Sequence, residues 1–573
     1  MRRTLLRTVV ALCAVVAGRD AFGQQVRGIV RDSASATPLP GAVVSILDSA
    51  GMTSARVIAD GSGRFAVARP ARAASLHVVR IGYSPRDVAI PTTESVTLEF
   101  AMRRLPAMLD AVRVSDREVC PGSSNRGAAF DLWEQARAGL LAAVVARETN
   151  PATATTVVYE RETLPNDDLI RSQTMRTSSG HTTRPFVASA PAATFAKRGY
   201  MREDTGGRLF FAPDADVLLD ETFAATHCFH LQAADTAHRN EIGIAFAPVA
   251  GRDTFVDVAG VVWMDRTTPA LRSFDFRFTR IEPAAERAGV GGHLEFLNMP
   301  NGVSFVERWY IRLPALEPIP MNARDRPSGQ ILRRQDNIDV RVAKFHETGG
   351  QILAATWQDK TSWRDSSAGI AGTVTRQSTN DAVPFALVIL EGTADTVTAD
   401  ARGQFAIAPL VPGRYSVVAV DTTMQAFVAP RSSSRRIDVP RGTVVPYQSQ
   451  LEPMTSLIER ACRGQKARTH TYGATAAIIG RLVLPTGAAA RDAEIHASWV
   501  SDVTLGAGVG INHGGQDITA DDRGRFMVCG VAMERPITLR ATIGTRVADT
   551  TVVVYDSILK AVEWRLPPVV DRP

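Results

Sequence analysis

Three short phrases of similar sequence, in distant parts of the chain, constrain its fold more than any other feature. They read ADGSGRF at 59–65, TADARGQF at 398–405 and TADDRGRF at 519–526. Each phrase has an aspartate that can accept hydrogen bonds from the backbone of a turn, then a glycine that tolerates a positive φ, then a phenylalanine. This order predicts a β-hairpin turn followed by a strand whose aromatic side chain lies in a core.

The similarity extends to the strands on either side of each phrase. The first strand of each copy alternates apolar residues around a central glycine, with the period of two expected for a half-buried strand. These strands are Val26-x-Gly28-x-Val30, Ile370-x-Gly372-x-Val374 and Ile478-x-Gly480-x-Leu482. A second strand follows at 42–46, 386–390 and 493–497. We therefore predict the same Ig-like β-sandwich module, of roughly 80–95 residues, three times.

The first module also resembles a known family. Its segments GIVRDSASATPLPGAVVSI, ADGSGRFAV and VVRIGYSPRDVAI are similar to carboxypeptidase regulatory-like domains. The resemblance implies a transthyretin-like β-sandwich, and the two later modules are similar to the same family or to its starch-binding-domain-like relatives. It implies little about function, because such modules accompany peptidases, receptors and glycan-binding domains alike.

A zinc peptidase domain is not predicted beside these modules. Its ligands would be an HxxE motif and a distant histidine, and the chain has one literal match, His238-Arg239-Asn240-Glu241, with His346 downstream. The surrounding sequence predicts successive strands, whereas that peptidase fold alternates helices and strands.

The middle of the chain, 104–365, does not follow the repeat. Apolar residues at helical spacing predict one main helix over Ala128–Glu148, and the rest reads as successive strands, so we expect an α+β domain. The segment from Gly260 to Phe278, GVVWMDRTTPALRSFDFRF, resembles a strand–turn–strand of lipoprotein carriers. That resemblance implies an open antiparallel sheet curved around the helix, with a concave apolar face. The alternative is a plain packed sheet.

The N-terminus predicts a secretory signal peptide. Arg2, Arg3 and Arg7 precede an apolar stretch, Thr8–Gly18, that is too short to span a bilayer. We expect cleavage before Gln24, export to a periplasm or outer cell surface, and no later transmembrane segment. The expected domains are a signal peptide at 1–23, a module at 24–103, the middle domain at 104–365, a module at 366–453, a linker at 454–475 and a module at 476–568.

Four cysteines remain after signal removal: Cys120, Cys228, Cys462 and Cys529. An even number in an oxidising compartment predicts two disulfides. Three pairings are possible. Cys120–Cys228 and Cys462–Cys529 are preferred because each closes a loop within one region.

Metal-ligating residue types gather at His227, Cys228, His230 and His238. Zinc binds such side chains, but residues three apart in a strand point to opposite faces. A local structural role is therefore the alternative to a metal site, and we expect no metal and no cofactor.

Candidate sugar-binding residues are aromatic. Trp499 precedes a glycine-rich segment, 506–515, which we interpret as a loop because no helix follows to complete a phosphate site. Tyr83 and Tyr415 are further candidates, and all three have the alternative of being core or edge residues. Arg435 and Arg436 belong to a basic loop that would attract acidic glycans or phosphates, or would simply be solvated.

These observations favour a non-catalytic protein that binds or scaffolds at the cell envelope, with a glycan or an envelope protein as partner. Carbohydrate is the expected ligand only by analogy with relatives of the fold. One alternative is a lipid- or protein-handling factor that uses the middle sheet, and another is a hydrolase with two carboxylates in the middle domain. The net charge is +6 but its arginines are scattered, which argues against a nucleic-acid surface.

Overall fold

The computed structural model describes residues 25–568, except 92–95, 106–119, 122–127, 183–189, 205–206, 267, 269, 320–339, 429–430, 465–474, 506–508 and 556. The expected signal peptide lies outside these residues. The chain divides into two compact units. Unit 1 holds the chain up to Glu160 and from Met175 to Asp365, and unit 2 holds Arg161–Thr174 and the chain from Ser366.

The first module is a two-sheet sandwich in unit 1. Its strands are β1 (Gln25–Asp32), β2 (Val43–Asp48), β3 (Thr53–Ile58), β4 (Arg64–Ala68), β5 (Ala73–Val79), β6 (Arg86–Ala89) and β7 (Val96–Met102). One sheet has the order β4-β1-β7 and the other β3-β2-β5-β6. Strand β1 pairs antiparallel with β4 and parallel with β7.

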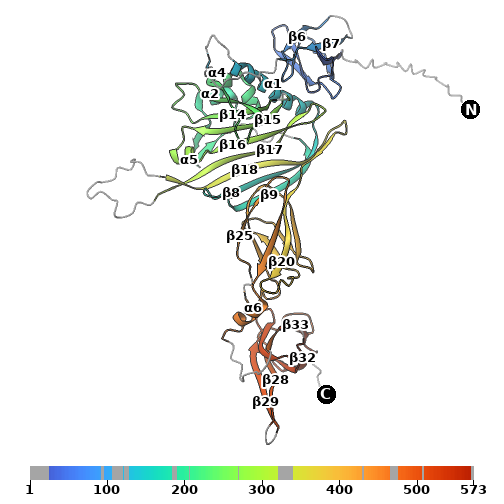
Figure 1. Ribbon diagram of the computed structural model, residues 1–573, viewed down its shortest axis with the longest axis vertical. Helices are drawn as coiled ribbons and strands as arrows, with labels where there is room; N and C mark the ends of the chain where they lie inside the picture. Colours follow the sequence, from blue (N-terminus) through green and yellow to red (C-terminus); the bar gives the residue numbers. More distant parts are fainter. Residues whose placement is uncertain are drawn as a thin grey trace, which may run out of the picture. The chain divides into compact units, whose positions relative to one another are not determined.

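The second and third modules, both in unit 2, repeat this strand order. Figure 1 shows both modules as packed strands, in yellow to orange and in orange to red. The second consists of β20 (Ala368–Arg376), β21 (Leu387–Leu390), β22 (Thr396–Thr398), β23 (Gln404–Leu410), β24 (Gly413–Val420), β25 (Arg435–Val439) and β26 (Val444–Leu451). The third consists of β27 (Thr475–Val483), β28 (Glu494–Leu505), β29 (Val509–Thr519), β30 (Arg525–Ala532), β31 (Pro536–Ile543), β32 (Arg546–Val553) and β33 (Leu559–Arg565). Their sheets are β23-β20-β26 with β22-β21-β24-β25, and β30-β27-β33 with β29-β28-β31-β32.

The repeated phrases form the same turn in all three modules. The aspartate side chain of each phrase accepts hydrogen bonds from the backbone N–H groups two and four residues later, at 2.8–3.0 Å. The glycine of each phrase has a φ between 70° and 73°, and each phenylalanine is buried. Phe65 pairs opposite Gly28, and Phe526 pairs opposite Gly480. Each ring fills the space that a side chain on the facing glycine would need, which explains the central glycine of the first strand.

The middle domain is a ten-stranded, mostly consecutive antiparallel sheet of unit 1. Its strands are β8 (Thr153–Thr163), β9 (Ile170–His181), β12 (His227–Gln232), β13 (Glu241–Pro248), β14 (Asp257–Asp265), β15 (Leu271–Thr279), β16 (Gly291–Asn298), β17 (Ser304–Pro318), β18 (Val340–Thr356) and β19 (Ser362–Arg364). The order is β12-β13-β14-β15-β16-β17-β18-β8-β9, with β19 beside β18. A separate pair is β10 (Met201–Asp204) with β11 (Gly207–Phe210).

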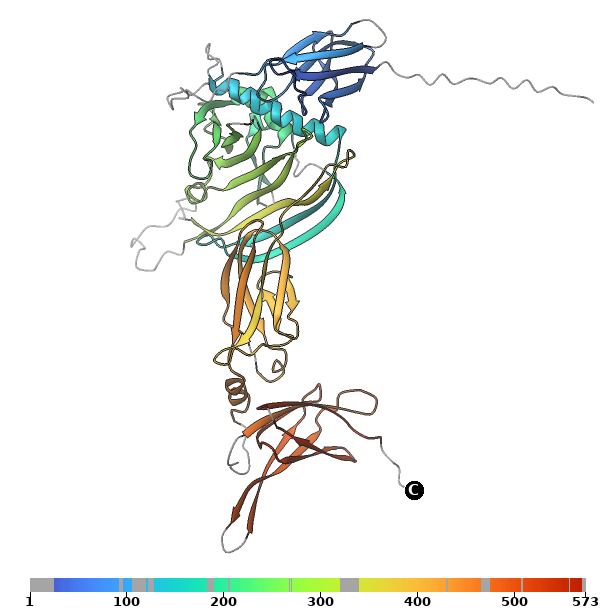
Figure 2. The ribbon, with the colours of Figure 1, turned by 45° about the vertical axis from the view of Figure 1, so that its right-hand side comes forward.

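One long helix, α1 (Ala128–Thr149), crosses the concave side of this curved sheet (Figure 2). Short helices accompany it: α2 (Ala192–Arg198), α3 (Ala215–Leu219), α4 (Glu221–Thr226) and α5 (Pro283–Arg287). Trp133 and Leu140 of α1 are buried against the sheet, in one core with Phe274. Val145 and Ala146 are buried with Val43 of the first module. The sheet thus covers one side of the helix and the first module covers another, and both sides are apolar.

Residues 161–174 belong to unit 2. They comprise the end of β8, the connecting residues and the start of β9, and are together called the β8–β9 turn below. Ile170 has only 2% of its surface exposed and lies in the core of the second module with Tyr415. The Gln173 backbone N–H donates to the Gly392 carbonyl at 2.8 Å. Arg161 Nη1 donates to the Pro412 carbonyl at 2.9 Å. The second module is thus completed by residues from an earlier part of the chain.

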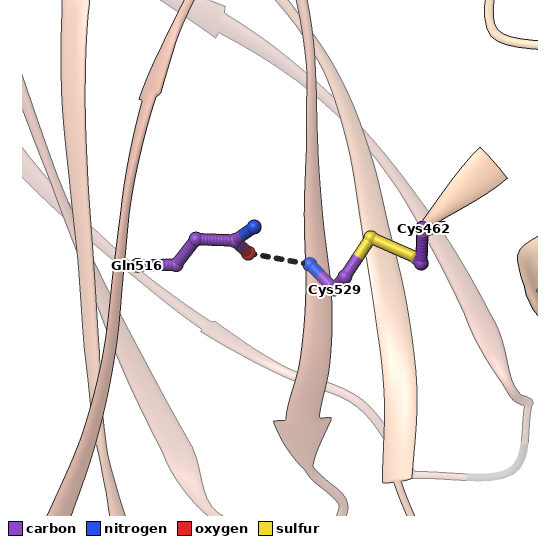
Figure 3. The surroundings of a disulfide bond; sticks show 3 residues. All are labelled: Cys462, Gln516 and Cys529. Atoms are coloured by element: carbon purple, nitrogen blue, oxygen red, sulfur yellow. Dashed lines mark hydrogen bonds between the residues drawn. A yellow bond between two sulfur atoms is a disulfide. The ribbon is translucent and has the colours of Figure 1, made fainter. Parts of the chain in front are cut away.

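The structure contains both disulfides that the sequence favoured. One joins Cys120 to Cys228 in unit 1. The other joins Cys462 to Cys529 of β30, and Gln516 Oε1 accepts the Cys529 backbone N–H at 2.7 Å (Figure 3). Cys462 ends the linker helix α6 (Met454–Ala461). Disulfides of this kind fit an oxidising compartment.

Candidate functional site

A cavity of about 280 Å³ lies in unit 1 between α1 and the sheet. Its walls come from α1, from the segment that begins α3, and from strands β8, β9, β15, β16, β17 and β18. Lining residues include Leu140, Val144, Ala154, Val158, Leu218, Phe274, Leu294, Phe296, Val306, Trp309, Ile352 and Trp357. The cavity is therefore the apolar hollow that the curvature of the sheet leaves beside the helix.

Side chains that alternate between the two faces of the strands form the inner part of the cavity. Phe274 of β15 is paired with Leu294 of β16, and Phe296 with Val306 of β17, so these side chains share one face of the sheet. Phe274 and Leu294 are buried in one core cluster with Leu140 of α1. This face provides mostly hydrocarbon and aromatic surface, as ligand pockets usually do.

The rim of the cavity is reached from solvent. Val158 of β8 has 42% of its surface exposed, and the lining residues Ser178–His181 of β9 are exposed. Residues of one continuous lining thus range from fully buried to solvent-exposed. A ligand entering from this side would meet polar side chains first and apolar walls deeper in.

Two buried polar side chains also line the cavity. Ser304 has 7% of its surface exposed and Gln351 has 5%. Among the described residues, neither Ser304 Oγ nor Gln351 Oε1 has a hydrogen-bond partner, although Gln351 Nε2 donates to Asp365. A buried hydroxyl or amide left unsatisfied costs about 1–3 kcal/mol. Gln351 pairs in register with Arg308, so its side chain lies on the other face of the sheet from Trp309. Ser304 is therefore the one of the two that can serve a ligand with a polar group on an apolar body.

Acidic and basic side chains converge on the opposite face of the sheet. His293 Nδ1 lies 2.5 Å from Asp275 Oδ1, and His293 Nε2 lies 3.1 Å from Glu295 Oε1. Burial alone lowers the pKa of His293, but the two carboxylates outweigh it and raise that pKa to about 9. Burial raises the pKa of Glu295, yet His293 and Arg308 together hold it at about 2. A protonated histidine between two carboxylates has no lone pair with which to act as a base, so this is an ion-pair network.

The side chains considered as candidate metal ligands have other partners in the structure. Cys228 is in a disulfide, and His227 is buried with Nδ1 3.0 Å from the Phe223 carbonyl and Nε2 3.2 Å from the Val258 carbonyl. His238 lies 2.9 Å from Asp235 and stacks on Trp263 at 3.9 Å. His230 follows on the same strand as His227, and no group of three metal-ligating side chains occurs in the described part of the chain.

Trp499, the first candidate for stacking on a sugar, has the alternative role of a core residue. Trp499 has 2% of its surface exposed and lies in the core of the third module. Its partner across the sheet is Gly514, where a side chain would overlap the indole. The glycine-rich segment expected as a loop is thus largely strand β29, and its small residues admit the tryptophan ring.

The two tyrosine candidates are also buried. Tyr83 donates a hydrogen bond to Asp32 Oδ2 at 3.0 Å in the first module. Tyr415 donates to the Val411 carbonyl at 2.6 Å, and burial raises the pKa of Tyr415 to about 12. Their hydroxyls satisfy buried acceptors, so neither ring is available for stacking on a sugar.

The basic candidates are exposed but engaged. Arg436 has 61% of its side-chain surface exposed and pairs with Asp167 Oδ2 at 2.5 Å within unit 2. Arg435 lies over the Tyr447 ring at 6.0 Å. Arg436 thus helps to fasten the β8–β9 turn to the second module, a role that the sequence did not predict.

The fold defines a multi-domain, mostly β protein in which three sandwich modules of one topology accompany a curved-sheet α+β domain. Comparison with protein families identifies two of these modules: residues 25–103 and 369–451 match the carboxypeptidase regulatory-like domain. The third module has the same strand order in the structure. No curated protein matches the chain.

Similar solved structures include two pilins and the Bacillus anthracis TIE protein. The Streptococcal ancillary pilin is 10% identical, covers 40% of this chain and 79% of its own, and has a TM-score of 0.15. The Bacillus anthracis TIE protein is 9% identical, with 72% and 83% covered and a TM-score of 0.15. The major pilin subunit of Bacillus cereus is 9% identical, with 75% and 99% covered and a TM-score of 0.13. TM-scores this low carry no argument about function.

Within the described residues, no helix has the length and apolar character needed to cross a membrane.

Proposed function

We propose that the chain is an exported, non-catalytic binding protein whose curved-sheet domain holds an apolar ligand, the acyl chain of a lipid, beside α1. The cavity of about 280 Å³ carries this proposal, because its inner wall is hydrocarbon and aromatic surface and its rim is exposed. An acyl chain is the common envelope ligand with this character, and each methylene buried would contribute about 0.8 kcal/mol. The buried Ser304 hydroxyl suits the polar group at its head.

A carbohydrate ligand has weaker support. The aromatic residues proposed to stack on sugars, Trp499, Tyr83 and Tyr415, are all buried. A hydrolase in the middle domain also has weaker support, since His227 contacts backbone carbonyls and His293 is held by two carboxylates. We therefore favour binding over catalysis, in the periplasm or at the outer surface.

The test is uptake of cis-parinaric acid, a fatty acid whose fluorescence rises in apolar surroundings, by the mature chain from Gln24. We expect a saturable rise. Ala143 lines the cavity from α1 and is half-buried, so Ala143→Phe should narrow the hollow and weaken binding at least about tenfold, or 1.4 kcal/mol.

The matched control is Ala406→Phe, which adds the same ring at an exposed position of β23. It should bind the probe as the unmodified chain does. If the unmodified chain shows no saturable rise, or if both variants bind equally, the cavity is not an acyl-chain site. Retained near-ultraviolet circular dichroism would show that Ala143→Phe still folds.

A further inference from the structure

Strand β29 forms an edge of its sheet in the third module, and it is unusually long. The equivalent edge strands, β3 in the first module and β22 in the second, have 6 and 3 residues, whereas β29 has 11. An edge strand presents a row of main-chain donors and acceptors to the outside of its sheet. A short edge strand exposes few main-chain groups, whereas the longer β29 exposes more of them.

The extra length carries the β28–β29 hairpin beyond the rest of the sheet (Figure 1). Strand β28 pairs with β29 as far as Leu505↔Val509, but with β31 only as far as Trp499↔Ile537. The outer part of the hairpin is therefore two-stranded. Isolated two-stranded hairpins are marginally stable in water, so this part lacks the support that a third strand gives.

Apolar side chains on this outer part are exposed. Val503 has 45% of its surface exposed, Val509 has 67% and Ile511 has 55%. Val503 and Ile511 face each other across the two strands. Together they form an apolar patch on a strand edge, which is typical of an interaction site.

The same edge also lacks the usual protection against pairing. No Asp, Glu, Lys, Arg or Pro occurs from Val503 to Gln516. The opposite edge of this sheet, β32, carries Arg546 and Asp549, and the β25 edge of the second module begins Arg435-Arg436. Charges of this kind discourage edge-to-edge contact, and β29 carries none over the eight residues that precede its Asp517.

We propose that β29 pairs antiparallel with β29 of a second copy of this chain, joining two four-stranded sheets into one. A two-fold axis between the two copies of β29 relates the same residues on both sides, so that each residue contacts its counterpart region on the other copy. With no charged residue between Val503 and Gln516, two copies meet without repulsion. The contact covers Val509 and Ile511 and gives the outer hairpin its third strand. This inference is independent of the proposed ligand.

The test is sedimentation equilibrium of the mature full-length chain over a wide range of concentration. We expect a reversible monomer–dimer equilibrium. Ile511→Lys places two like charges at the two-fold contact and should weaken association at least about tenfold. Val547→Lys is the matched control, because Val547 is 57% exposed on the opposite edge strand, and it should associate as the unmodified chain does.

Hydrogen exchange locates the contact. Amides at 509–513 should become protected as concentration rises, while those of β32 should not. A chain that stays monomeric throughout, or a dimer that Ile511→Lys and Val547→Lys affect equally, would overturn the proposal. If the chain stays monomeric, the partner of the β29 edge would instead be an extended segment of another protein. Equal melting temperatures of the two variants would exclude unfolding as the cause.

Discussion

The second and third modules have one strand order but are stabilised differently. The second module receives Ile170 into its core from the β8–β9 turn and buries an ion pair between Arg376 and Asp421. The third module is cross-linked to α6 by a disulfide and extends its β28–β29 hairpin. Their shared features are the turn phrases and the facing glycine and phenylalanine.

The comparison teaches that the turn phrases and the alternation of apolar residues along the strands define the sandwich fold. The edge strands and the segments that flank each module determine what that module contacts. Arg376 is the last residue of β20 and comes four residues after the central glycine of its strand. Leu484, directly after β27, comes four residues after the central glycine of the third module, so the two positions are equivalent. Register along the second strand likewise places Asp421 where the third module has Ile543. Leu484 and Ile543 pack against the apolar core of the third module. One fold thus accepts a buried ion pair or an apolar pair at one place.

The disulfide gives the largest expected effect. The Cys462–Cys529 bond closes a loop of 67 residues, and Cys462→Ser with Cys529→Ser should destabilise the third module by about 4 kcal/mol in the chain-entropy model. The second module should change by less than about 1 kcal/mol, as for sites that share few partners. Urea unfolding followed by hydrogen exchange in each module measures both.

Removal of Cys120–Cys228 is the control, since that bond belongs to unit 1. An equal loss in both modules after removal of Cys462–Cys529 would contradict the comparison. It would mean that Leu457 of α6, which is buried with Met424 and Met527, makes the two modules one cooperative unit.

The buried ion pair tests whether the modules are interchangeable at this place. Asp421→Ile alone leaves Arg376 buried without its carboxylate and should cost about 3 kcal/mol. The double change Arg376→Leu with Asp421→Ile copies the third module and should recover most of that loss, because an apolar pair replaces an ion pair at little cost. Denaturant unfolding of the full chain measures the difference. If the double variant is no more stable than Asp421→Ile, the two positions are not equivalent.

Ile170→Ala tests whether the β8–β9 turn is part of the second module. Ile170 is 2% exposed, and truncation of a buried isoleucine costs at least about 2 kcal/mol. We expect the loss of hydrogen-exchange protection in β20 and β24 as well as in β9. Leu164→Ala, a half-buried position in the same turn, is the control and should cost less than about 1 kcal/mol. Lost protection confined to β9 would exclude Ile170 from the module's stability.

Much of the fold was predictable because its determinants are local. The turn aspartates, positive-φ glycines and alternating strands lie within a few residues of one another, so the three sandwiches follow from the sequence. The main helix follows from its spacing, and it is observed as Ala128–Thr149. The contact between this helix and the first module was not predicted, because the two are far apart in the sequence.

The candidate site was predictable only as a concave apolar face. The cavity depends on the curvature of the sheet and on how closely α1 approaches it, and neither is recorded in a local pattern. The burial of Trp499 depends on its pairing with Gly514 across a hairpin that the sequence presents as a glycine-rich loop. The place of Ile170 in another module is likewise a long-range contact. Each failure concerns a contact that a short stretch of sequence does not record.

The smallest expected effect concerns the shared turn. Asp400 and Asp521 each accept two backbone hydrogen bonds, and Asp521 Oδ2 also accepts the Arg525 Nε–H at 2.7 Å. Replacing either by alanine should destabilise its module by about 1 kcal/mol, with Asp521→Ala slightly the larger. The exposed neighbour Asp522→Ala is the control and should change stability by less than about 0.5 kcal/mol.

Acid tests whether the ionised carboxylate of Asp521 stabilises its turn. Burial raises the pKa of Asp521, but hydrogen bonds from Arg525 and Arg523 outweigh it and hold that pKa below its usual value. A group whose folded pKa lies below its unfolded value of about 3.9 contributes its full stability above that pH and loses it as the pH falls through the folded pKa. The difference in unfolding free energy between the unmodified chain and Asp521→Ala should therefore shrink below about pH 4. A difference that is constant down to about pH 2 would mean that the ionised carboxylate is not what stabilises the turn.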